Sequence, residues 1–266
     1  MSETKHQHHD CAAIQGFVES GDPDRSVVAK IAPREKRCLL LSLYAFNLEA
    51  ARITWKAPDP ATAAIRFQWW HDIVDKAGSG DDIPCHHVAE GLARLIGQCR
   101  LPTAPFHRLL DAYQSTASLP DGHDERQRFE QYIDSTAGEV MWLAAQILDR
   151  PLACEETVRD LAWGCGVASY LRAVATLKAR GRLDFLTDMT TQHWAVTAAT
   201  ARIDRARSHR DELPASIFPA LLTGWRANST LRRARVNIAR VDAGGLDESE
   251  FVRRVRLAIC GLTGRW

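Results

Sequence analysis

The chain has 266 residues, of which 45% are hydrophobic and 25% are charged, and its formal net charge is +1. This composition is typical of a globular protein with enough apolar side chains for a large buried core. A net charge this close to zero gives no overall attraction to nucleic acid, which we exclude as a partner.

The cysteines and the apolar segments indicate a cytoplasmic location. Seven cysteines are scattered along the chain without any C-x-x-C pair. Zinc sites and disulfide frameworks need closer, paired spacing, so we expect reduced thiols. The start of the sequence lacks the basic and apolar regions of a signal peptide, and no apolar run approaches the roughly 18 residues of a membrane span.

Helical patterns then follow one another along the chain. The polar, histidine-rich residues 1–20 predict a flexible tail, and residues 21–266 are expected to form a single domain. No segment alternates apolar and polar residues as a strand does, so we predict an all-α protein. Apolar residues at helical spacing, bounded by Pro, Gly or capping residues, predict helices over 25–32, 34–55, 61–77, 86–99, 103–116, 124–148, 155–178, 191–212, 215–223, 229–241 and 247–263.

The helix predicted over 34–55 has polar residues in an apolar run, "LLLSLYAFNLEAARITW". Asn47, Glu49 and Arg52 interrupt Leu, Ala, Tyr and Phe, and Tyr44 shares a face with Arg52. Glu49 and Arg52 are three residues apart and close enough to pair. One interpretation is a buried polar network, because buried charges need partners. The other is a site for an anionic lipid or a diphosphate.

Two further segments contribute candidate residues. In "RFQWWHDIVDK", Gln68, Asp72 and Asp75 follow each other by helical steps, which we interpret as a solvated helix end with His71 at its surface. In "GVASYLRAVATLKARGRLDFL", Arg172 is followed by a basic cluster at the predicted helix end that includes Arg180 and Arg182. Guanidinium groups bind phosphate through paired hydrogen bonds, so these arginines are candidates for binding phosphate.

No metal site is predicted from the sequence. The adjacent residues Cys85, His86 and His87 offer three ligand types, but neighbours in sequence do not easily converge on one tetrahedral ion.

Four segments, in order, resemble the squalene/phytoene synthase family. They are "VAKIAPREKRCLLLSLYAF", "AIRFQWWHDIVD", "YIDSTAGEVM" and "LRAVATLKARGRLDFL". The resemblance implies the isoprenoid synthase fold, an all-α helical bundle around a central apolar cavity. It also implies the head-to-head joining of two allylic diphosphates, in which aspartates on two helices hold the Mg²⁺ ions that neutralise the leaving group.

The residues at those metal-binding positions depart from the family pattern. The first aspartate motif falls on Ala51, Arg52 and Trp55, and the second falls on Ala173 and Leu177. Tyr44 and Arg172 match polar residues that the family uses. We therefore expect a catalytically degenerate member without a cofactor, in which Mg²⁺ binds only if the enzyme interpretation applies.

Four segments resemble the non-catalytic branch that is related to a mitochondrial complex I assembly factor. They are "LYAFNLEAARI", "RFQWW", "YLRAVATLKARGRLDFL" and "ARSHRDELPASIFPALL". That resemblance implies assembly of a respiratory NADH dehydrogenase, with its subunits or assembly intermediates as partners. The alternatives are an active prenyl transferase using Glu49, Asp72 and Asp75, and a carrier of an isoprenoid diphosphate or lipid. The arginines over 226–256 mostly predict a solvated helix face. The alternative is a basic patch that rests on an anionic membrane surface, peripheral to the inner membrane.

Overall fold

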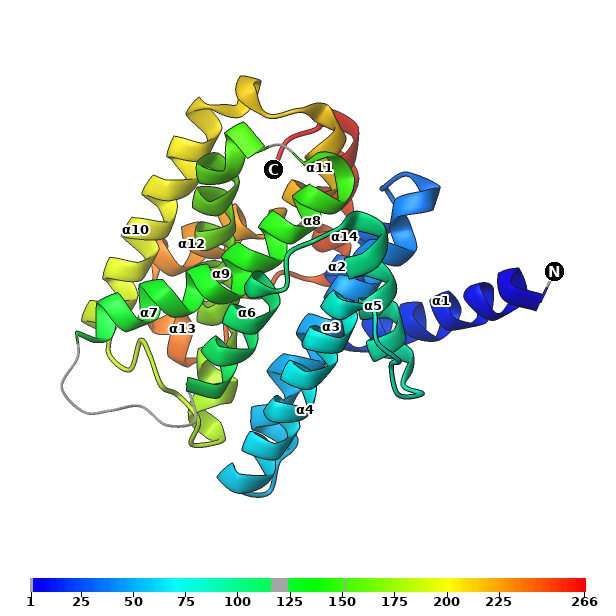
Figure 1. The fold of residues 1–266 in the computed structure, drawn as a ribbon. Helices are drawn as coiled ribbons and strands as arrows, with labels where there is room; N and C mark the ends of the chain where they lie inside the picture. Colours follow the sequence, from blue (N-terminus) through cyan, green and yellow to red (C-terminus); the bar gives the residue numbers. More distant parts are fainter. Residues whose placement is uncertain (1, 116–123, 151) are drawn as a thin grey trace. The chain divides into compact units, whose positions relative to one another are not determined.

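The computed structural model describes residues 2–115, 124–150 and 152–266 (Figure 1). Every regular element in these ranges is helical, which confirms the all-α prediction. The chain divides into two compact units, of which unit 1 comprises Met1–Leu119 and Leu143–Arg150, and unit 2 comprises Pro120–Trp142 and Pro151–Trp266. The single domain predicted over 21–266 stays a prediction.

Helix α3 (Arg34–Lys56) is the centre of unit 1. Its residues 39–47 are all buried, as expected for a helix that is apolar on every side and surrounded by other helices. The helices that contact it are α1 (Ser2–Gly21), α2 (Pro23–Ala29), α4 (Pro60–Ser79), α5 (His87–Cys99) and α6 (Ala104–Ser115) (Figure 1).

Helix α1 occupies the range that we predicted to be a flexible tail. Ile14 and Val18 in its second half are fully buried, and the helix contacts α3 and α5. These two side chains are four residues apart and therefore share one face of the helix. The polar composition of the segment hides this short apolar stripe.

Capping side chains begin several helices of unit 1. Asp22 and Asp59 accept the N–H groups of Arg25 and Thr62, and each is followed by a proline at the first helical position. At the start of α5 the cap is His86, whose Nδ1 accepts the N–H of Ala89 at 3.3 Å.

Helix α9 (Glu155–Ala179) is the centre of unit 2. A methyl group at its Gly164 would lie 2.4 Å from Ile203 Cγ1, so glycine is what allows α10 to approach closely. The helices that contact α9 are α7 (Glu125–Ile133), α10 (Met189–Ser208), α11 (Phe218–Leu221), α12 (Ala227–Val236) and α13 (Ala239–Asp242).

Some predicted helices are interrupted in the structure. The helix expected over 124–148 consists of α7, a π-helical turn over Asp134–Gly138, and α8 (Glu139–Asp149). Within the turn, Thr136 Oγ1 donates to the Tyr132 carbonyl at 2.6 Å. The helix expected over 215–223 is a 3₁₀ turn at Ala215–Ile217, then α11, then a second 3₁₀ turn at Leu222–Gly224.

The last helix, α14 (Glu250–Thr263), buries none of its side chains. Phe251, Ile259 and Leu262 are exposed on it. All seven cysteines lie in the described ranges, where none of them forms a disulfide, and among them Cys85 is the exposed one. Within those ranges, we find no helix with both the length and the apolar character needed to cross a membrane.

Candidate functional site

Tyr44 and Asn47 are both buried on α3, and Asn47 contacts α6. Tyr113 Oη, on α6, donates to Asn47 Oδ1 at 2.9 Å. Burial raises the pKa of the Tyr113 hydroxyl to about 12 and raises the pKa of Tyr44 as well. Both hydroxyls are therefore neutral near pH 7. The predicted polar network thus holds for Asn47, with a partner that the sequence did not indicate.

Tyr44 is held by a cation rather than by a hydrogen bond. The Arg25 guanidinium lies 5.6 Å from the centroid of the Tyr44 ring, and Arg25 Nη1 pairs with Asp22 Oδ2 at 3.1 Å. The buried Tyr44 hydroxyl makes no hydrogen bond within the described ranges.

Glu49 and Arg52 lie in a separate pocket of about 230 Å³. No ion pair joins them among the described residues; instead, the Arg52 guanidinium lies 4.9 Å from the centroid of the Phe17 ring. Arg52, Lys56 and Arg66 place three cations around one carboxylate, so the pocket favours an anion. The complete lining is Glu49, Arg52, Ile53, Lys56, Arg66, Trp69, Trp70 and His86.

Three aromatic rings form one wall of this pocket. The Trp69 and Trp70 rings meet edge to face at 4.9 Å, and their centroids lie 5.4 and 5.7 Å from that of His86. Burial lowers the pKa of His86, which fits its neutral role as the cap of α5. Such a wall packs against hydrocarbon, while the cations opposite suit a phosphate group.

Gln68 does not line this pocket. Its Nε2 donates to Asp72 Oδ1 at 2.8 Å, four residues further along the exposed face of α4. This contact agrees with the interpretation of the segment as a solvated helix face.

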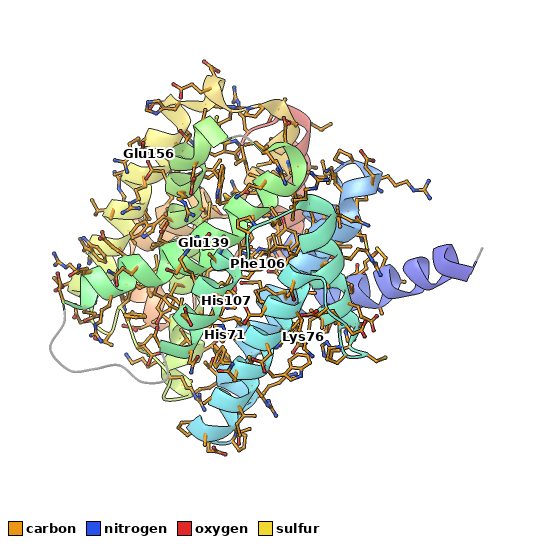
Figure 2. All side chains as sticks on the ribbon, in the orientation of Figure 1. His71, Lys76, Phe106, His107, Glu139 and Glu156 are labelled. Atoms are coloured by element: carbon orange, nitrogen blue, oxygen red, sulfur yellow. The ribbon has the colours of Figure 1, made fainter. Side chains whose placement is uncertain are left out.

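His71 belongs to a cluster that sequence reasoning missed. Its Nδ1 lies 2.7 Å from His107 Nδ1 on α6, and the two rings are nearly parallel. Figure 2 labels both residues on their neighbouring helices. The outer nitrogens face carboxylates, His107 Nε2 at 3.0 Å from Asp75 and His71 Nε2 at 3.4 Å from Asp111. Burial lowers the pKa of His71. The 36 residues between the histidines leave no local pattern that predicts their contact.

The candidate arginines of unit 2 have different surroundings. Arg172, on α9, donates from Nη2 to Ser169 Oγ at 3.0 Å, and its Nη1 lies 3.8 Å from Asp247 Oδ1. Arg180 and Arg182 are exposed where α9 ends. Their backbone N–H groups bond to the last carbonyls of that helix.

The positions that the resemblance assigns to magnesium ligands do not fit the ion. Ala51, Trp55, Ala173 and Leu177 carry no oxygen or nitrogen ligand that Mg²⁺ prefers, and Arg52 is a cation. Across the described part of the chain, no group of three His, Cys, Asp or Glu side chains is arranged to hold a metal ion.

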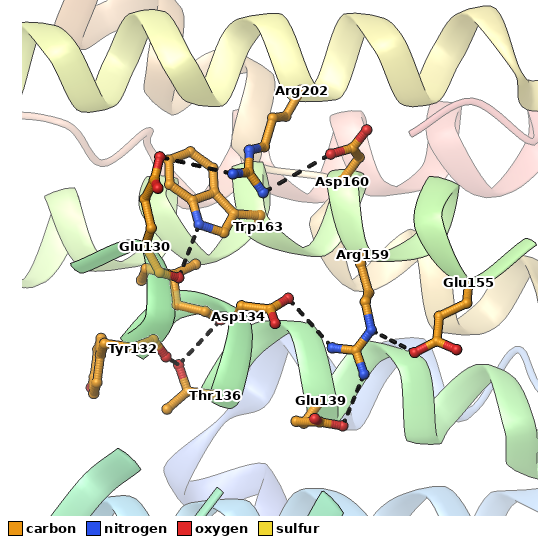
Figure 3. Close-up of polar contacts among 11 residues, drawn as sticks. Glu130, Tyr132, Asp134, Thr136, Glu139, Glu155, Arg159, Asp160, Trp163 and Arg202 are labelled. Carbon is orange, nitrogen blue, oxygen red and sulfur yellow. Dashed lines mark hydrogen bonds and ion pairs between the residues drawn. The ribbon is translucent and has the colours of Figure 1, made fainter. Parts of the chain in front are cut away.

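A charged cavity of about 710 Å³ in unit 2 was also missed. Arg159 is one of its lining residues and pairs with Asp134, Glu139 and Glu155 at 3.4, 3.2 and 2.7 Å (Figure 3). Nearby, the Arg202 guanidinium lies 4.3 Å from the Trp163 ring centroid. The i, i+4 spacing of Glu155 and Arg159 was the available sequence signal. Because these carboxylates are occupied by arginine, we interpret the cluster as structural.

The family model of squalene/phytoene synthases matches residues 18–258 of this chain. The chain belongs to the squalene/phytoene synthase family. Solved structures show the same fold: a squalene synthase from Alicyclobacillus acidocaldarius, 19% identical, superposes with a TM-score of 0.70 over 86% of this chain and 94% of that chain. A dehydrosqualene synthase in complex with ligand, 16% identical, gives 0.68 over 98% and 97%. The predicted isoprenoid synthase-like fold is confirmed.

Several relatives of this chain are named as assembly factors of respiratory complex I. NADH dehydrogenase (ubiquinone) complex I, assembly factor 6, from Mus musculus is 22% identical over 85% of this chain and 73% of that protein. The Bos taurus protein of the same name is 23% identical over 77% and 68%. The Drosophila melanogaster homolog is 26% identical over 59% of this chain, which spans about half, 48%, of that relative.

Proposed function

We propose that this family member assists the assembly of a respiratory NADH dehydrogenase and does not synthesise squalene or phytoene. The observation that carries the proposal is the set of side chains at the five metal-ligand positions. None of Ala51, Arg52, Trp55, Ala173 and Leu177 is a carboxylate. Without those carboxylates, the diphosphate leaving group loses its magnesium clamp, an electrostatic contribution worth several kcal/mol of barrier.

The names of the relatives support the proposed assembly role. Distant similarity extends over most of the chain to proteins called complex I assembly factor 6 in mammals. The partners on this proposal are subunits or assembly intermediates of the NADH dehydrogenase.

Two measurements test the proposal together. Deleting the gene in its source organism should lower the NADH:quinone activity of membranes while carotenoid and hopanoid contents stay constant. Purified protein given labelled farnesyl or geranylgeranyl diphosphate with Mg²⁺ or Mn²⁺ should release no diphosphate, beside an active squalene synthase as control. Formation of a C30 or C40 hydrocarbon would refute the proposal and favour the prenyl transferase alternative. Normal NADH oxidation in the deletion strain would refute the assembly role.

A second candidate function is binding of an isoprenoid diphosphate without turnover. It is favoured by the pocket of Arg52, Arg66 and the Trp69–Trp70 wall, which combines cations with an apolar surface. Binding of farnesyl thiodiphosphate should quench tryptophan fluorescence, and Arg66→Glu should weaken it. Lys76→Glu, an exposed charge reversal on the same helix but outside the pocket lining, is the control.

The proposed location is peripheral to the inner membrane. Exposed Phe251, Ile259 and Leu262 lie on α14 together with arginines. An exposed apolar stripe flanked by basic residues is typical of helices that lie on anionic bilayers. Several arginines of this region are paired, however: Arg226 with Asp247, and Arg256 with Glu248. The basic surface predicted over 226–256 is therefore weaker than the sequence suggests.

A further inference from the structure

A third cavity, of about 880 Å³, opens in unit 1 where α3 begins; we call it the α3 N-terminal groove. Its lining residues come from helices α1, α2, α3 and α5 and from the turn between α2 and α3. It shares no lining residue with the pocket of Glu49 and Arg52. Its lining comprises Cys11, Gln15, Ser26, Ala29, Lys30, Arg34, Glu35, Arg37, Cys38, Leu39, Leu41, Arg94 and Gln98.

The charges of the groove favour an anion. Lys30, Arg34, Arg37 and Arg94 line it against one carboxylate, that of Glu35. Part of this charge is already engaged. Lys30 Nζ lies 3.4 Å from Glu19 at the exposed surface, and Arg37 Nε donates to the Ala32 carbonyl at 2.8 Å. Arg34 is exposed and makes no ion pair with another described residue, so its guanidinium is available to a ligand.

The start of α3 adds to this attraction. The 23-residue helix begins after Pro33, whose side chain cannot cap it, so no side-chain oxygen accepts from its first N–H groups. The partial positive charge of a helix N-terminus attracts phosphate and carboxylate groups. Arg34, the first residue of the helix, lines the groove at this end.

A buried hydroxyl independently indicates a ligand. Ser26, on α2, lines the groove with an exposed fraction of 0%, yet its Oγ has no hydrogen-bond partner in the described structure. Leaving a buried polar group unpaired is costly, and most such groups in proteins have a partner. A ligand oxygen in the groove would supply that partner.

We propose that the α3 N-terminal groove binds a phosphate group, through Arg34, the first turn of α3 and the hydroxyl of Ser26. This inference concerns a site separate from the proposed assembly role and does not depend on it. The phosphate belongs either to a small soluble phosphate compound or to the headgroup of an anionic phospholipid. The chemistry of recognition is the same for both.

The test uses the full chain with two probes. Inorganic pyrophosphate is titrated while the melting temperature is followed, and vesicles of phosphatidylglycerol are compared with vesicles of phosphatidylcholine in flotation. A rise in melting temperature with pyrophosphate indicates a soluble ligand. Flotation with phosphatidylglycerol alone indicates a headgroup. The absence of both responses overturns the proposal.

Variants assign the binding to the groove. Arg34→Glu should weaken the responding probe by about tenfold or more, since a hydrogen bond to a charged group is lost and a like charge is introduced. Lys76→Glu on α4 makes the same charge reversal at an exposed cation outside the groove and should leave binding unchanged. Equal losses in the two variants would mean non-specific charge attraction and would refute the site.

Ser26→Ala separates binding from folding. Removing an unpaired buried hydroxyl should keep or raise the melting temperature of the ligand-free protein, while the response to the probe falls. A variant with a lower ligand-free melting temperature and undiminished binding would show that the hydroxyl serves the fold and not a ligand.

Discussion

Two tyrosines of unit 1, the buried Tyr44 and the half-buried Tyr113, have opposite hydrogen-bond status, which predicts opposite effects of the same substitution. Tyr113→Phe leaves Asn47 Oδ1 buried without its donor and should lower the free energy of unfolding by about 1–3 kcal/mol. Tyr44→Phe removes a hydroxyl without a hydrogen-bond partner in the described ranges and should have little effect or stabilise slightly. Urea denaturation of both variants measures the difference. Equal destabilisation by the two substitutions would contradict the assigned hydrogen bonds.

His71 predicts how stability depends on pH. Its pKa is lowered in the folded protein by burial, so the unfolded chain binds its proton more readily. The stability that the neutral ring contributes is present above its unfolded pKa of about 6.5 and is lost as the pH falls below that value. His107, Asp75, Asp72 and Asp111 surround it.

Replacing the ring tests this directly. The free energy of unfolding of the wild type should rise between pH 5 and pH 7, roughly the window around that value, and His71→Asn should make the rise smaller. His86, whose pKa is also lowered, keeps part of the dependence in the variant. Parallel pH profiles for wild type and variant would show that His71 does not titrate in this way.

For individual residues, the sequence indicated which polar side chains are candidates but few of the residues that they contact. Asn47 and Arg52 were recognised as polar interruptions of a buried helix, and Arg180 and Arg182 as basic residues at the end of a helix. The donor to Asn47 comes from Tyr113, 66 residues away. Such pairings are set by how helices pack, which a local pattern does not encode.

Two glycines in helices predict opposite effects of adding a methyl group. At Gly164 of α9 the new Cβ would lie 2.4 Å from Ile203 and 2.9 Å from the Ala199 carbonyl oxygen, so Gly164→Ala should destabilise by about 1–3 kcal/mol. At exposed Gly97 of α5, nothing lies within 4 Å, and Gly97→Ala should stabilise by about 0.5–1 kcal/mol through higher helix propensity. Thermal unfolding compares them. A stabilised Gly164→Ala would contradict the close approach of α9 and α10.

Helices bounded by proline or other helix-terminating residues were predicted well. Helices whose ends or interruptions depend on tertiary contacts were not. The prediction over 34–55 corresponds to α3 (Arg34–Lys56), because Pro33 and the "APDP" segment bound it. The π-helical turn at Asp134–Gly138 went unseen, since the apolar spacing continues through it. Helix α1 was missed because its apolar stripe, with Ile14 and Val18, is short and follows a very polar start.

For the whole molecule, the side chains at the metal positions predict indifference to magnesium. A ligand that binds only the folded state raises the melting temperature by mass action. Millimolar Mg²⁺ should therefore leave the melting temperature of this protein unchanged, while it raises that of a squalene synthase that carries the aspartates. A clear rise with Mg²⁺ would mean that carboxylates elsewhere in the chain hold the ion.

The uneven exposure of the cysteines has a practical consequence. Cys85 is exposed, whereas the other six thiols are partly or fully covered. A maleimide dye should therefore label the natural sequence mainly at Cys85, one residue before His86 of the Trp69–Trp70 pocket. The efficiency of fluorescence energy transfer from Trp69 and Trp70 to the dye should then change when a ligand fills the pocket. This measurement needs no engineered residue.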